Sequence, residues 1–189
     1  MAQLQFSTGL TAGTSGIEAA SQITAQNISS GDKATVTAHN GLIDIENIST
    51  TNSGADIEIT TVTSGNVELT NANAARDLII NAASDLAIEH SESGGNTKIS
   101  AAGNAGIQTA KAGGSLAVDA NNINIISADT GIDLNLNAAN LVETDVLTAG
   151  NDISIHATTF TANDTEAGNN IDITADSIDA ENTVSGNDI

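Results

Sequence analysis

Acidic side chains return at fixed intervals along this chain of 189 residues, and their types and spacing suggest cation binding. Asp56 and Asp77 occupy one position of a repeated pattern, and Asp133 and Asp152 occupy the same position further along. If successive units of the pattern stack directly, the carboxylates of each pair lie about 5 Å apart. Like charges that close repel unless water or a cation bridges them, and calcium accepts carboxylate oxygens in flexible geometry.

Two interpretations of these aspartates stay open. An Asp or Asn at the start of a turn bonds to its own backbone and caps the turn, which requires no ligand. Alternatively, Asp56, Asp77, Asp133 and Asp152 are weak calcium sites, and calcium is then the one cofactor of the chain. The glycine-rich nonapeptide repeat that binds calcium in β-rolls is absent, so we favour turn capping.

The chain has few residues of the types that commonly act in catalysis, and we expect that it is not an enzyme. His39, His90 and His156 fall at different positions of the repeat, so we expect solvated histidines on the surface. Cys, Trp and Tyr are absent, and Phe occurs only twice. Carbohydrate-cleaving enzymes built on parallel β-helices use clustered carboxylates and aromatic platforms for sugar rings. Here the carboxylates are spread along the whole chain.

The elements that must position these residues are short strands that recur at a fixed period. Each unit reads Gly, two small polar residues, apolar–polar–apolar, a polar residue and Ala. Alternation of apolar and polar residues with period two predicts a strand. The return of this pattern at a fixed interval predicts that an equivalent strand forms in each successive coil. The units start at Gly54, Ala75, Gly94, Gly113, Gly131, Gly150, Gly168 and Gly186.

Two columns of stacked side chains follow from this period. The first is Ile57, Leu78, Thr97, Leu116, Leu134, Ile153, Ile171 and Ile189, and the second is Ile59, Ile80, Ile99, Val118, Leu136, Ile155 and Ile173. A βαβ crossover takes about 30 residues, so these shorter units leave no room for one. The pattern therefore predicts an all-β parallel β-solenoid (β-helix) of about 19 residues per coil and nine or ten coils.

The period also predicts how the chain is organised. We expect a single domain with regular coils over residues 54–189 and less regular coils over 1–53, including a loop or bulge at 39–53. The glycines are expected at turns that require positive φ. A new coil starts at residues 186–189, so we expect an open C-terminal end that a longer chain, a second copy or a partner covers.

A second set of inward strands is expected seven to ten residues after the first column. Leu141 and Phe160 are its expected members in two of the later coils, and Val146 and Val184 are assigned to a third inward run.

The composition excludes several classes of partner. The chain carries 24 acidic and 4 basic residues, with a formal net charge of −20, so we expect no nucleic-acid binding. No apolar run has the length of a membrane span, so we expect no membrane insertion. The first residues show no leader pattern, and we expect a mature piece of a longer exported chain.

Units such as residues 113–120 and 150–155 resemble the repeats of filamentous-haemagglutinin-type exoproteins, which are large two-partner-secretion adhesins of bacteria. The resemblance covers residues 54–189 and concerns the length and style of the repeat. It implies a right-handed parallel β-helix, a location outside the cell at the bacterial surface, and a rod that displays adhesive modules. It assigns no catalytic or binding residue.

We therefore expect a non-catalytic structural or adhesive rod, the shaft segment of a bacterial surface exoprotein. One alternative is a subunit of a self-assembling extracellular filament, joined head-to-tail through open solenoid ends. A weaker alternative is a carbohydrate-binding or carbohydrate-cleaving β-helix. The expected partners are neighbouring solenoid segments or copies of the chain end-to-end, and a host or cell-surface receptor.

Overall fold

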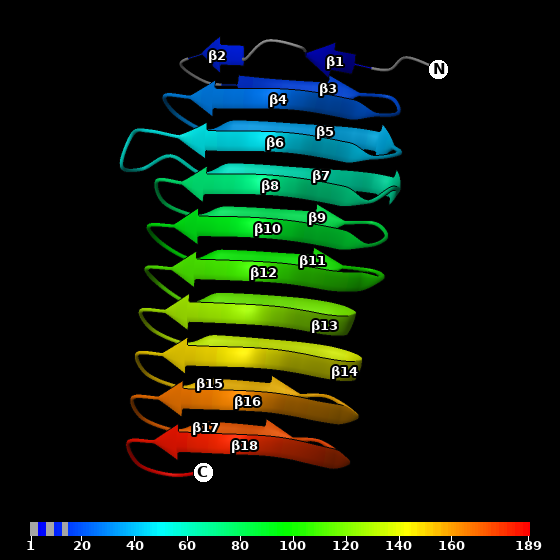
Figure 1. The fold of residues 1–189 in the computed structure, drawn as a ribbon. Helices are drawn as coiled ribbons and strands as arrows, with labels where there is room; N and C mark the ends of the chain where they lie inside the picture. Colours follow the sequence, from blue (N-terminus) through cyan, green and yellow to red (C-terminus); the bar gives the residue numbers. More distant parts are fainter. Residues whose placement is uncertain (1–3, 7–9, 13–14) are drawn as a thin grey trace.

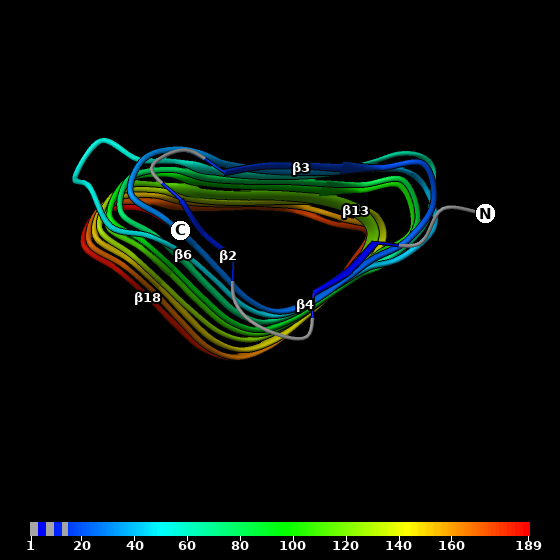
Figure 2. The same cartoon turned by 90° about the horizontal axis from the view of Figure 1, so that it is seen from above.

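The structure, a computed structural model, describes residues 4–6, 10–12 and 15–189. These residues form one 18-stranded parallel sheet without any helix, wound into a β-solenoid of about 9 turns with about 19 residues per coil. The coils stack from the N-terminal to the C-terminal end and advance in a right-handed sense (Figures 1 and 2). The predicted all-β, right-handed parallel β-helix is confirmed.

Each coil contributes strands to two long sides of the rod. The strands are β1 (Leu4–Phe6), β2 (Leu10–Ala12), β3 (Ser15–Ala19), β4 (Ile23–Ser30), β5 (Ala34–Asn40), β6 (Ile43–Thr50), β7 (Ile57–Ser64), β8 (Val67–Ala74), β9 (Leu78–Ala82), β10 (Leu86–Ser93), β11 (Thr97–Ala101), β12 (Asn104–Ala112), β13 (Leu116–Thr130), β14 (Leu134–Ala149), β15 (Ile153–His156), β16 (Thr159–Ala167), β17 (Ile171–Thr174) and β18 (Ser177–Ser185). Strands β3, β5, β7, β9 and β11 form one side, and β4, β6, β8, β10 and β12 form the other (Figures 1 and 2). Strands β13 and β14 run continuously through both sides.

The predicted aliphatic columns lie in the lumen of the solenoid. Leu116 pairs with Leu134 on the next coil, and Leu134 pairs with Ile153 on the coil after that. Ile153 pairs in turn with Ile171, and all four side chains are buried. Thr97, the polar member of this column, is buried beside Ser93, and their hydroxyl oxygens are 2.8 Å apart. The lumen is therefore mainly aliphatic, and the hydroxyl groups of Ser93 and Thr97 satisfy each other by a hydrogen bond.

The second inward run differs from the prediction in one coil. Val142, not Leu141, points into the lumen, because Asn122 pairs with Leu141 after a register shift in β13. Phe160 lies directly above Val142 and is fully buried, as expected. The third inward run excludes Val146 and Val184, which both point outward. It consists instead of Ile28, Ile48, Ala72, Ser91, Ala110, Ala128, Leu147 and Thr165.

The glycines at the start of the units are required for a different reason from the one predicted. Among the described residues, positive φ occurs at Gly41 and Gly65, and neither starts a unit. At Gly113, Gly131 and the later unit starts, an added Cβ would collide with the carbonyl oxygen of the glycine one coil earlier. The turns stack so closely that their backbones nearly touch, and glycine is the residue that permits this approach.

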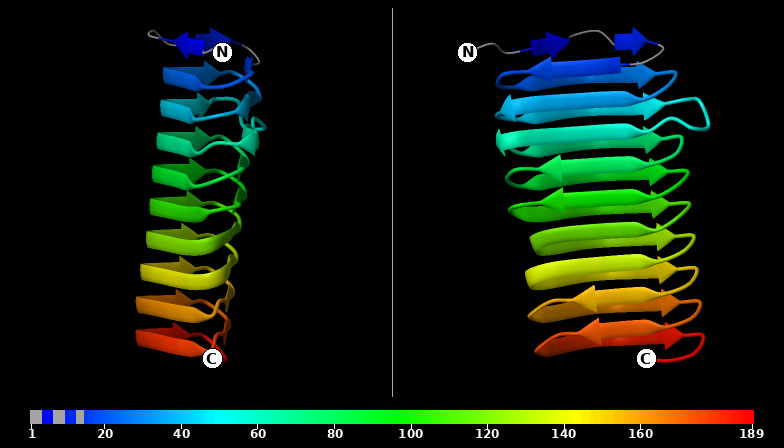
Figure 3. Two further views of the ribbon diagram at one scale, coloured as in Figure 1. Left: turned by 90° about the vertical axis from the view of Figure 1, so that its right-hand side faces the viewer. Right: turned by 180° about the vertical axis from the view of Figure 1, so that it is seen from behind.

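The coils before residue 54 belong to the same ladder. Strand β3 pairs with β5 and β5 with β7, while β4 pairs with β6 and β6 with β8. The predicted irregularity consists of a bulge after Ala38 and a loop at residues 51–56, which protrudes from one edge of the rod (Figures 1 and 3). Ile43, Ile45 and Ile48 point inward from β6.

Candidate functional site

The aspartates of the predicted sites stand in one column at the turn before the first lumen strand. From Asp56 to Asp152, each side chain of this column accepts a hydrogen bond from the backbone N–H of its counterpart one coil later. Asp77 Oδ1 accepts from Asn96 N at 2.8 Å, and Asn96 Oδ1 accepts from Ser115 N at 2.9 Å. The sequence predicted that these residues cap their own turns. Instead, each one caps the turn of the next coil.

A guanidinium group bridges Asp56 and Asp77. Arg76 Nε lies 2.7 Å from Asp56 Oδ1 and 3.2 Å from Asp77 Oδ2, and its Nη2 also donates to Asp56 Oδ2. The hydrogen bond that Arg76 donates to Asp56, followed by the attraction of the Asp56 charge, raises the pKa of Arg76 above its ordinary value. Arg76 therefore remains charged at every ordinary pH and takes the bridging place that the calcium interpretation gives to a cation.

An amide group bridges the second pair. Asn151 Nδ2 donates to Asp133 Oδ1 at 2.8 Å and to Asp152 Oδ2 at 3.2 Å. Asp152 Oδ1 accepts from the backbone N–H of Asn170 at 3.0 Å and from the side-chain amide of Asn169 at 2.9 Å. Arg76 and Asn151 both immediately precede the second aspartate of their pair. Each pair is thus joined by a donor from its own turn.

The structure thus brings Asp56 next to Asp77 and Asp133 next to Asp152, as the stacking predicted. Over the part of the chain that the structure describes, no three His, Cys, Asp or Glu side chains gather in a way that could hold a metal ion. Calcium binding by the two pairs stays a prediction, and calcium would compete with Arg76 and Asn151 for the same oxygens.

The three histidines are exposed and lie in separate columns. His39 Nε2 lies 2.6 Å from Glu18 Oε1, and His90 Nδ1 lies 2.6 Å from the hydroxyl of Thr109 on the next coil. His156 projects from the end of β15 into a groove. The predicted surface positions of the histidines are confirmed.

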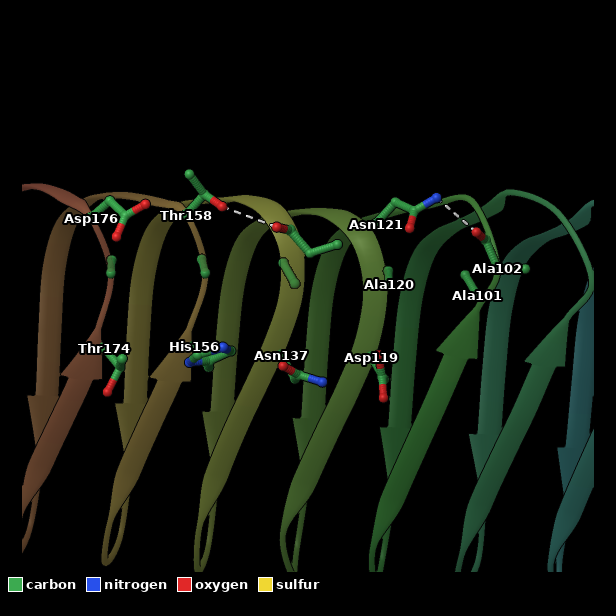
Figure 4. Close-up of a pocket in the computed structure, with 14 residues that line it drawn as sticks. Ala101, Ala102, Asp119, Ala120, Asn121, Asn137, His156, Thr158, Thr174 and Asp176 are labelled. Atoms are coloured by element: carbon green, nitrogen blue, oxygen red, sulfur yellow. Dashed lines mark hydrogen bonds between the residues drawn. The ribbon is translucent and has the colours of Figure 1, made fainter.

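This groove follows one corner of the rod, where the strands of the first side end. Its floor is a column of small side chains, one from each coil, and it has a volume of about 650 Å³. The floor residues are Ala101, Ala120, Ala138, Ala157 and Ala175. Figure 4 shows Asp119, Asn137, His156 and Thr174 in a row along one rim, each from a successive coil. We call this row the polar rim.

The opposite rim is fixed by hydrogen bonds to the backbone. Asn121 Nδ2 donates to the Ala102 carbonyl oxygen at 2.9 Å, and Thr158 Oγ1 donates to the Ala139 carbonyl oxygen at 3.1 Å (Figure 4). In contrast, the four side chains of the polar rim form no hydrogen bond or ion pair with any other described residue. Their donors and acceptors face solvent.

Sequence reasoning missed this groove, although its signal is present in the repeat. The repeat places an alanine in one column and a polar residue in the column before it. Small residues in one column beside polar residues in the next leave a furrow where the chain turns the corner. The surface position of His156 was predicted, but only the stacking of the coils shows that Asn137 and Thr174 lie beside it.

Comparison with family models, curated protein sequences and solved structures yields no match to this chain. In the described residues, no helix is long and apolar enough to cross a membrane.

Proposed function

We propose that this chain is a non-catalytic structural rod, the shaft segment of a bacterial surface exoprotein that acts outside the cell. The observation that carries the proposal is the continuous ladder, in which every coil between the two ends pairs with the coils before and after it along both sides of the rod. A spacer must hold the segment at its far end at a fixed distance from its base, and a continuous ladder of coils supports that role.

Two physical properties support a mechanical role. Bending the rod would break inter-coil hydrogen bonds on one side and open a tightly packed aliphatic lumen on the other. At about 4.8 Å per coil, about 9 turns give a rod roughly 40 Å long. The net charge of −20 keeps neighbouring rods apart in solution. The location outside the cell is supported by the resemblance of the repeats to those of surface exoproteins.

Whole-coil deletion tests the spacer role. Removing residues 116–133 joins Ser115 to Leu134, which takes the lumen position of Leu116 because the two residues are register partners. The chain is anchored on a cell surface and carries an epitope at its far end. The shortened chain should retain its fold, and antibody binding to the epitope should decrease with each coil that is removed. Deletion of residues 116–124 is the control, because half a coil destroys the register. Antibody access that does not depend on the number of coils would contradict the proposal.

One observation favours the alternative of a head-to-tail filament subunit. Among the described residues, no strand pairs with the outer side of the coil formed by β17 and β18, and Ile178, which occupies the lumen column of Phe160, is 52% exposed. A further coil, from a longer chain or a second copy, would cover this surface. Electron microscopy of the purified chain tests the alternative, with Ile178→Lys as the variant that should abolish fibres. Short rods at all concentrations would contradict it.

A further inference from the structure

We propose that the corner groove binds a linear glycan built of neutral or amino-sugar residues, with one sugar ring placed on each coil. The site consists of the alanine floor, the polar rim and the opposite rim with Asn121, Thr158 and Asp176. This inference does not depend on the role of the rod as a shaft.

The shape of the groove suits a long, thin ligand. It runs along the axis of the rod over several coils instead of ending in a closed cavity, and it offers about 650 Å³ (Figure 4). The alanine floor is apolar and free of bulk, so the C–H face of a pyranose ring can lie on it. The hydroxyl groups at the edge of the ring then point toward the two rims.

The side chains of the polar rim are available to a ligand. In several other polar columns, side chains of successive coils bond to each other: Asn71 donates to Asn47 at 2.9 Å and Asn182 donates to Asp164 at 2.9 Å. Asp119, Asn137, His156 and Thr174 form no such ladder, although they are stacked in the same way. Together they provide both donors and acceptors, which is the combination that hydroxyl groups require.

The spacing of the rim favours a glycan over an extended peptide. Successive coils are about 4.8 Å apart, whereas an extended peptide advances about 3.3 Å per residue and repeats its side-chain direction every two residues. The side chains of a peptide along the groove would therefore not match the spacing of the residues in the polar rim. Linked pyranose rings advance by about one ring width, which is close to the coil spacing, so each coil can meet one ring. In β-1,4-linked chains, alternate rings turn opposite edges toward the polar rim.

Charge selects among glycans. Asp119 and Asp176 lie on opposite rims of the groove, and the whole chain has a net charge of −20. Sulfated or uronic-acid chains are repelled by this field, whereas neutral chains are accepted and amino sugars are attracted.

The groove is arranged for binding and not for cleavage. Asp119 and Asp176 lie three coils apart, and three coils at about 4.8 Å each separate them by roughly 14 Å. The two carboxyl groups of glycoside hydrolases lie about 5–9.5 Å apart. This pair is too far apart to act on the same glycosidic bond.

Calorimetric titration of the full chain tests the proposal. The probes are hexamers of cellulose, of chitin and of chitosan, a sulfated hexasaccharide and a serine-rich hexapeptide. We expect binding of at least one neutral or amino-sugar hexamer and none of the sulfated probe or the peptide. The double variant Asn137→Ala/His156→Ala should weaken that binding at least tenfold, since each lost hydrogen bond contributes a factor of several.

Asn135→Ala is the matched control, because Asn135 is exposed on the same coil but lies outside the groove. It should leave the affinity unchanged, and circular dichroism should show the same fold for all variants. Three results would overturn the proposal: no glycan bound at millimolar concentration, preference for the sulfated probe or the peptide, or unchanged affinity in the double variant. None of these results affects the deletion test of the rod, so the two proposals fail separately.

Discussion

At the scale of single residues, the close stacking of coils decides which side chains are permitted. The stacked glycines illustrate this, because the carbonyl oxygen of one turn occupies the place where the next turn would carry a Cβ. Gly131→Ala should therefore destabilise the fold by about 1–3 kcal/mol, as overpacking does in a tightly packed core. Chemical unfolding measures the change.

Gly54 provides the control for this prediction. It starts a unit in the sequence but lies in the protruding loop, where an added Cβ would meet no atom within 4 Å. Gly54→Ala should change the free energy of unfolding by less than about 0.5 kcal/mol. Equal effects of the two substitutions would show that the stacked turns do not require glycine.

The capping role of the aspartate column leads to a second prediction. Asp152→Ala removes the acceptor of the Asn170 backbone N–H and of the Asn169 side-chain amide, so it should destabilise the chain by about 1–3 kcal/mol. Asp152→Asn keeps an acceptor oxygen and should cost less. Thermal unfolding compares the two variants. If Asp152→Asn lowered the stability as much as Asp152→Ala, the stabilisation would come from the charge of Asp152 and not from its acceptor oxygen.

The contacts of single side chains could be predicted from the sequence only in part. The column shared by Asp56, Asp77, Asp133 and Asp152 followed from the period alone. The bridges did not, because Arg76 and Asn151 differ in type and length, and only the side-chain positions show that both reach two carboxylates. The groove was missed because its residues are unremarkable one by one.

At the scale of strands, the lumen columns were predictable wherever the alternation is unbroken. The exception, Leu141 in place of Val142, arises where β13 pairs with β14, because the register shifts by one residue between Ala120 and Asn122. Two apolar residues in succession carry no information about which one faces inward. Similarly, the third inward run contains Ser91 and Thr165, whose polarity hides it from a search for apolar residues.

Thr165 supports a prediction at this scale. Its side chain is 1% exposed between Leu147 and Thr183 of the neighbouring coils, and its hydroxyl oxygen has no hydrogen-bond partner. Thr165→Val should therefore stabilise the fold by about 1 kcal/mol, because an unsatisfied buried hydroxyl is removed without change of shape. Urea unfolding tests this prediction.

Thr61→Val is the contrasting variant. The Thr61 hydroxyl donates to the Gly65 carbonyl oxygen at 2.9 Å and accepts from Ala83 N at 2.7 Å, so the same change should destabilise the fold there. If Thr165→Val were also destabilising, the hydroxyl of Thr165 would have a partner that stabilises it, such as a buried water molecule.

At the scale of the whole molecule, stability should depend on ionic strength. With 24 acidic and 4 basic residues on a narrow rod, repulsion between coils opposes folding. Raising sodium chloride shortens the screening length from about 30 Å at 0.01 M to about 3 Å at 1 M, so the melting temperature should rise by several degrees. A melting temperature that falls with salt would show that the ion pairs of Lys33 and Arg76 outweigh this repulsion.

Calcium chloride at matched ionic strength separates screening from specific binding. Stabilisation by calcium beyond that of magnesium, lost on replacing Asp133 and Asp152 by Asn, would support the calcium sites. Equal stabilisation by both salts would assign the effect to screening.

The central claim is that each coil lies directly on the one before it. The chain contains no cysteine, so pairs of spin labels can be placed by cysteine substitution without interference. Glu58, Asn135 and Asp172 stand in one outward column, with Asn135 four coils and Asp172 six coils from Glu58. Double electron–electron resonance should give narrow distances near 19 Å for Glu58→Cys/Asn135→Cys and near 29 Å for Glu58→Cys/Asp172→Cys, at about 4.8 Å per coil. Broad distributions, or distances that do not grow with the number of coils, would contradict the solenoid and the rod that depends on it.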